Sequence, residues 1–139
     1  MNWRLIFQLS LFGLAMGIAT VFVIPSNVEP LFWLVIFIIS AYLIATRSGG
    51  RYFAHGVLVG VANSVWITAC HILLFSRYIA NHPREAAMMA SMPLPTHPRV
   101  MMLLTGPVIG VISGCVLGVF AIIASKFVGA RARPVVTNP

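Results

Sequence analysis

The chain has 139 residues, of which 60% are hydrophobic and only 8% are charged, and its mean hydropathy is +0.98. A soluble domain has about 45–50% apolar residues, so this composition excludes an ordinary soluble protein and predicts an integral membrane protein. Nine basic residues outnumber two acidic ones. Most of the basic residues flank apolar runs, which is typical of helices oriented in a bilayer. We therefore expect the lipid bilayer, and no nucleic acid, as a partner.

Apolar runs long enough to cross a hydrocarbon core of about 30 Å define the expected helices. The first run has a basic start, as a secretory signal has, but it is too long for a signal core and lacks a clear cleavage site, so we expect an uncleaved helix. The predicted fold is an all-α membrane protein, a single domain over residues 1–139 in which four transmembrane helices form a compact bundle. The predicted spans are residues 4–24, 31–46, 52–77 and 99–126.

The segment between the third and fourth spans, residues 79–98, is expected to be an outer loop with a short interfacial helix. Pro83 suits the first turn of a helix, and Glu85 would lie near the positive helix end. The prolines that follow end this helix, which we expect over about residues 83–92. After the fourth span, residues 127–139 are predicted to form a short, frayed cytoplasmic tail.

The distribution of charge predicts the orientation of the four spans. One side collects six basic and no acidic residues, whereas the other collects three basic residues and both acids. Because basic residues in short loops are retained in the cytoplasm, we expect both termini to be cytoplasmic. The membrane would be a plasma membrane or bacterial inner membrane.

Small residues recur at every fourth position in three of the spans. A step of four residues advances only about 40° around a helix, so each row forms one narrow face. Such small-xxx-small rows let helix backbones approach closely in lipid, and they predict tight packing of the first, third and fourth spans. Alternatively, the rows would let helices slide or would line an oligomeric pore. The second span is bulky on nearly every face and should cover the bundle from outside. The predicted packing residues are Gly13, Gly17, Gly56, Gly60, Ser64, Gly106, Gly110, Gly114 and Gly118.

A few polar residues within the spans form a candidate polar site of Asn63, Thr68, His71 and Pro107. Thr68 and His71 share one helix face, which we expect to point toward the fourth span. There, Pro107 has no amide hydrogen, so the carbonyl oxygen of Leu103 loses its helical hydrogen bond. A neutral imidazole could donate a hydrogen bond to that oxygen instead. The simpler interpretation is that His71 only makes a hydrogen bond within the bundle, rather than acting as a ligand or proton relay.

Histidines and methionines in the outer loop suggest a soft-metal site, because thioethers and imidazoles suit Cu(I). Their spacing matches no recognised motif, and flexible, apolar methionines suit an interfacial helix that lies on the membrane or over the mouth of the bundle as a lid. We favour the lid and expect no metal and no cofactor. The weak metal candidates are His82, His97, Met88, Met89 and Met92.

The predicted spans contain no Asp or Glu, although transporters coupled to protons or cations usually keep an ionisable group near the midplane. We find no serine, histidine and carboxylate cluster and no phosphate loop, so we expect no enzyme. The sequence favours a non-catalytic module that packs with itself, as a homo-oligomer, or with another membrane protein. The alternative is a small oligomeric transporter or channel with a polar path near Asn63 and His71.

Overall fold

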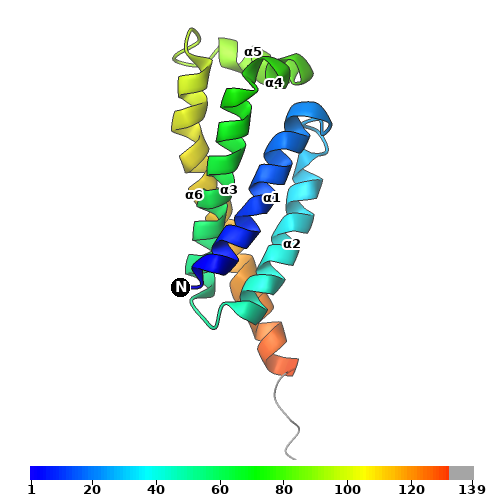
Figure 1. Cartoon of the computed structure of the whole chain (residues 1–139), viewed down its shortest axis with the longest axis vertical. Helices are drawn as coiled ribbons and strands as arrows, with labels where there is room; N and C mark the ends of the chain where they lie inside the picture. Colours follow the sequence, from blue (N-terminus) through cyan, green and yellow to red (C-terminus); the bar gives the residue numbers. More distant parts are fainter. Residues whose placement is uncertain (132–139) are drawn as a thin grey trace, which may run out of the picture.

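The structure is a computed structural model that describes residues 1–131 of the chain. Every regular element in this range is a helix, and four of the helices are long and apolar enough to cross a membrane. The prediction of an all-helical chain with four such helices is therefore confirmed. Most of the predicted tail, residues 132–139, lies outside the described range. The helices are α1 (Trp3–Phe22), α2 (Glu29–Arg47), α3 (Tyr52–Leu73), α4 (Phe75–Asn81), α5 (Pro83–Ala90) and α6 (Pro98–Arg131) (Figure 1).

The third long helix ends earlier than the apolar run predicts. At Leu74 the backbone leaves the helical region, with φ −104° and ψ 28°, and α4 begins at the next residue. The prediction of one continuous span over residues 52–77 is therefore wrong in its last turn. Helix α5 begins at Pro83, where the sequence predicts it, and α4 and α5 lie across one end of the bundle (Figure 1). We call residues 75–92, which include these two helices, the lid.

Helix α3 is central, because it packs on α1 and on α6, whereas α2 packs mainly on α6. Four of the four-spaced glycines, Gly13, Gly56, Gly60 and Gly114, lie close to the backbone of a neighbouring helix. A methyl group added at Gly60 would collide with the backbone of Gly114, and one at Gly13 would come within 2.5 Å of the Cα of Asn63. Backbone contact between α3 and its two neighbours therefore leaves no room for side chains at these positions.

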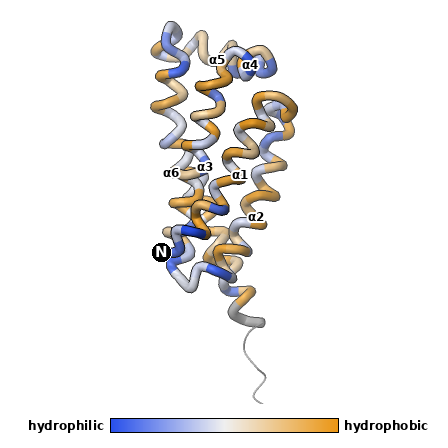
Figure 2. The backbone as a smooth tube through the Cα atoms, in the orientation of Figure 1, coloured by the Kyte–Doolittle hydropathy of each residue, from blue (hydrophilic) through white to orange (hydrophobic). Residues whose placement is uncertain are grey.

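The hydrophobic core gathers at the end of the bundle that holds the N-terminus, which we call the core end. Its buried members are Leu5, Ile6, Leu9, Ala41, Ile44, Val59, Leu117 and Ala121. Helix α2 buries residues only in its second half, so it is anchored to the bundle at the core end. Figure 2 shows hydrophobic residues along the four long helices and hydrophilic residues nearer their ends. The opposite end, beneath the lid, is the lid end.

Candidate functional site

At the lid end a cleft of about 760 Å³ lies between α2, α3 and α6, with the lid over it. Small-molecule sites usually measure about 300–1,000 Å³ and are mainly apolar. Apolar side chains such as Leu34, Ile67 and Ile109 form much of the wall. Phe37 and Phe120, which meet edge to face with centroids 6.3 Å apart, line the cleft and also pack on the hydrophobic core. The cleft is thus bounded toward the core end.

Three of the four residues in the predicted polar site, Asn63, Thr68 and His71, line this cleft. Asn63 is only 3% exposed, and its Oδ1 accepts a hydrogen bond of 3.0 Å from the backbone amide of Gly13. Because only the oxygen of the side-chain amide can accept that bond, the orientation of the amide is fixed and Nδ2 is its remaining donor. Nδ2 is buried and has no hydrogen-bond partner. A buried donor without a partner costs about 1–3 kcal/mol, which a ligand with an acceptor group would recover.

His71 has a different partner from the one that the sequence predicts. Its Nε2 lies 2.9 Å from the hydroxyl oxygen of Thr20 on α1, and that hydroxyl donates to the carbonyl of Met16. The predicted bond to the carbonyl that Pro107 frees on α6 is therefore wrong. The ring turns toward α1, because α3 packs on α1 as well as on α6. Pro107 itself is not among the residues that line the cleft.

Three aromatic rings stack where the lid meets α3. The centroids of His71 and Tyr78 lie 4.0 Å apart and those of Tyr78 and His82 4.4 Å apart, with 22° between the planes in both pairs. His82 Nδ1 lies 2.9 Å from the carbonyl oxygen of Tyr78, and its Nε2 is buried without a partner. Burial raises the pKa of Tyr78 to about 12, and the negative charges of Glu85 and Glu29 add to this shift. Tyr78 therefore remains a neutral phenol between the two imidazoles.

Both acidic side chains of the sequence, Glu29 and Glu85, line the same cleft. Glu29 accepts a hydrogen bond of 3.1 Å from the indole nitrogen of Trp33. One carboxylate oxygen of Glu85, Oε2, is buried without a partner. Burial alone would raise the pKa of Glu85, but hydrogen bonds from Ser26 and the backbone and the charges of His82 and Arg84 together lower it. The Glu85 side chain is therefore an anion at neutral pH.

The predicted metal candidates are divided between two environments. Met88, Met89 and Met92 line the cleft together with Met102 of α6. His82 is buried, whereas His97 is exposed and lies 2.9 Å from the hydroxyl of Thr96. Within residues 1–131, His, Cys, Asp and Glu side chains form no group of three or more that could hold a metal ion. The methionines thus supply the cleft with a flexible apolar surface.

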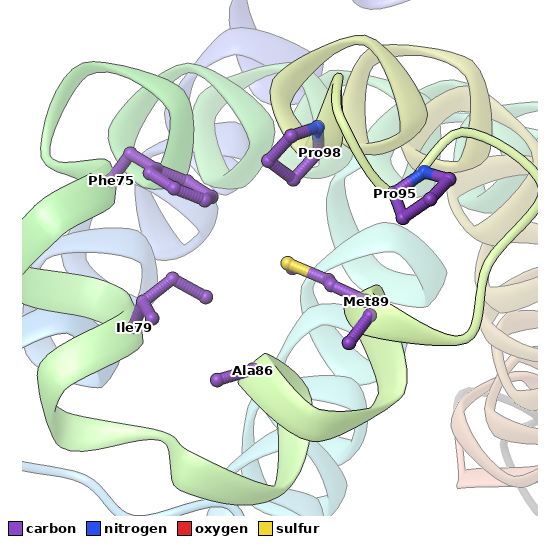
Figure 3. Close-up of a pocket in the computed structure, with 7 residues that line it drawn as sticks. Phe75, Ile79, Ala86, Met89, Pro95 and Pro98 are labelled. Atoms are coloured by element: carbon purple, nitrogen blue, oxygen red, sulfur yellow. The ribbon is translucent and has the colours of Figure 1, made fainter.

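A smaller apolar pocket of about 190 Å³ lies between α4, α5 and the start of α6 (Figure 3). Phe75 and Ile79 come from α4, and Ala86 and Met89 come from α5 (Figure 3). Pro95 lies in the segment before α6, and Pro98 is the first residue of α6. Met89 lines both this pocket and the larger cleft. The smaller pocket has no carboxylate and no unpaired polar group among its lining residues, so the larger cleft is the candidate site.

Comparison with known protein families, with curated proteins and with solved structures found no match for this chain. The function is therefore inferred from the geometry of the cleft.

Proposed function

We propose that the chain is a non-catalytic, multi-pass membrane module that binds a compact amphipathic ligand in the cleft at its lid end. The observation that supports this most strongly is the unpartnered, buried Nδ2 of Asn63 in the wall of an otherwise apolar cleft. Native proteins rarely leave such donors unsatisfied, so the donor indicates a group that arrives from outside the chain. The charge distribution supports cytoplasmic termini and a lid on the outer face of the membrane.

In this proposal the glycine rows hold the module together. The collision that a methyl group at Gly60 would make with Gly114 supports glycine-mediated packing of α3 on α6. Packing contacts of this kind drive association in lipid, where burial of apolar surface gives little gain. The packed helices then supply two fixed walls of the cleft, and α2 supplies the third.

An oligomeric transporter or channel is the second candidate, supported by the presence of Asn63, Thr68 and His71 in one cleft. A path through a single chain would need an opening at the core end. There, Ile44, Leu117 and Ala121 are completely buried. Ligand binding needs no such opening, and we therefore place it first.

Two substitutions on α6 test the proposed site. Ile109 lines the cleft and Val108 does not, although the two are 61% and 58% exposed. We expect Ile109→Trp to fill the cleft and to lower the affinity for a neutral hydrophobic probe, N-phenyl-1-naphthylamine, at least tenfold. Val108→Trp adds the same indole outside the cleft and should leave the affinity unchanged.

The measurement is saturable fluorescence enhancement in nanodiscs, from which the signal of empty nanodiscs is subtracted. Equal affinities of the wild type and both variants would reject the cleft as the binding site. Flux of a small solute into proteoliposomes that Asn63→Leu abolishes would instead favour the transporter.

A further inference from the structure

The charge of the cleft differs from that of the rest of the chain. The formal net charge is +7, yet both acidic residues, Glu29 and Glu85, line this one cleft. Among the described residues that line it there is no Lys or Arg. The cleft therefore concentrates the negative charge of a basic protein at an apolar cavity.

The carboxylate of Glu85 is incompletely paired. Within residues 1–131, its Oε2 is buried without a hydrogen-bond partner, and the one side chain that pairs with Glu29 is the neutral indole of Trp33. A buried carboxylate oxygen without a donor is costly, and a positive charge in the cleft would offset that cost. Tyr78 lines the cleft beside both acids, and their negative charges add to the effect of burial that raises the pKa of its phenol.

Aromatic rings and thioethers complete the lining near the two acids. Trp33 and Tyr78 present π faces, on which an organic cation is stabilised by the ring quadrupole. The methionines of the lid are polarisable and adapt to ligands of different shape. Farther along the wall, Asn63 Nδ2 is free to donate to an acceptor atom or an aromatic face of the ligand body.

We propose that the ligand is a compact hydrophobic cation, whose onium group lies between Glu29 and Glu85 and whose apolar body lies against α3 and α6. This inference rests on the proposed function of the cleft and names the charge of its ligand. The volume of about 760 Å³ suits a drug-sized molecule. An aminophospholipid shares the onium chemistry, so the experiment separates the two sources.

Two probes of matched shape and opposite charge give the test. Tetraphenylphosphonium and tetraphenylborate differ in the sign of their charge, and both are measured by equilibrium dialysis against the protein in phosphatidylcholine nanodiscs, with empty nanodiscs subtracted. We expect saturable binding of the cation with at least tenfold higher affinity than the anion. Either Glu29→Gln or Glu85→Gln should weaken cation binding up to about fivefold, and the double variant about tenfold or more.

Thr46→Lys is the control, because it adds a positive charge at the other end of α2, where Thr46 is exposed. It should leave the affinity of both probes unchanged. Circular dichroism and gel filtration verify that each variant keeps the fold.

Each other outcome has a distinct meaning. If both probes bind equally and Ile109→Trp weakens both, the cleft binds ligands but the inference about charge is wrong. If neither binds and the neutral probe also fails, the proposed function itself is wrong. Phosphatidylethanolamine that copurifies with the wild type but not with the double variant, without binding of the phosphonium, would overturn the choice of a compact cation.

Discussion

Helices α2, α3 and α6 contribute to both ends of the bundle, but the two ends differ in what those helices enclose. At the core end, Ile44 of α2 and Leu117 of α6 are completely buried. At the lid end, the first half of α2 and the facing part of α6 enclose a cleft that is lined by two carboxylates and by Asn63, whose Nδ2 has no partner. This difference supports our proposal that the core end stabilises the fold, while the lid end binds a ligand.

The largest expected effect tests whether the glycine rows set the spacing of the helices. Gly114→Leu would force a side chain against the backbone of Val57. We therefore expect the free energy of unfolding to fall by about 3 kcal/mol or more, or the variant to fail to fold. Val111→Leu, on the exposed face of the same helix, should be nearly neutral. Thermal unfolding in detergent, followed by circular dichroism, measures both. Equal unfolding temperatures of the two variants would show that close backbone contact at Gly114 does not set the spacing of the helices.

A pair of truncations on α6 compares the two ends directly. Leu117→Ala truncates a fully buried side chain at the core end, and we expect it to lower the free energy of unfolding by about 2–4 kcal/mol. Ile109→Ala, in the cleft wall, should cost less than about 1 kcal/mol because the side chain already borders open space. Chemical unfolding in mixed micelles gives both values. A cost at Ile109 as large as that at Leu117 would contradict the distinction between the two ends.

The ring stack is expected to hold the lid on the bundle. Tyr78→Ala removes two stacked pairs, each worth about 0.5–1.5 kcal/mol, whereas Tyr78→Phe keeps the rings in contact. We expect faster hydrogen exchange over residues 75–92 in the alanine variant and little change in the phenylalanine variant. If the phenylalanine variant exchanged as fast as the alanine variant, the phenol oxygen and not the stack would secure the lid.

The smallest effect concerns the pH dependence of cation binding. The pKa of Glu85 is lowered from 4.5, so the carboxylate form is favoured in the folded protein. The contribution of Glu85 to phosphonium binding should therefore persist as the pH falls to about 5 and be lost only at lower pH, through the lowered pKa. The difference in affinity between the wild type and Glu85→Gln, measured across this range, isolates that contribution. Its loss near pH 6 would contradict the assigned shift.

The sequence predicts the four long helices well, because apolar length alone determines which segments can span a bilayer. It misses the break at Leu74, since neither glycine nor proline interrupts the apolar run there. The stack of Tyr78 between two histidines depends on that break and is missed for the same reason. Asn63, Thr68 and His71 line one cleft. The hydrogen-bond partner predicted for His71 is wrong, because helical spacing does not show which neighbouring helix a side chain meets.

The two acids show the limit of the sequence most clearly. The charge count assigns Glu29 and Glu85 to one side of the membrane, but nothing in their spacing predicts that they share a cleft. Their approach depends on where α2 packs and on how the lid folds over the bundle. Both are consequences of tertiary contacts between segments far apart in the chain.

The most direct test of the central claim is the position at which a small neutral aryl diazirine attaches to the protein in nanodiscs, located by peptide mass spectrometry. We predict attachment at cleft residues such as Ile67 and Met102, reduced by an excess of unlabelled tetraphenylphosphonium. Attachment confined to residues outside the cleft, such as Val65 and Val108, with no effect of the competitor, would contradict a ligand site at the lid end.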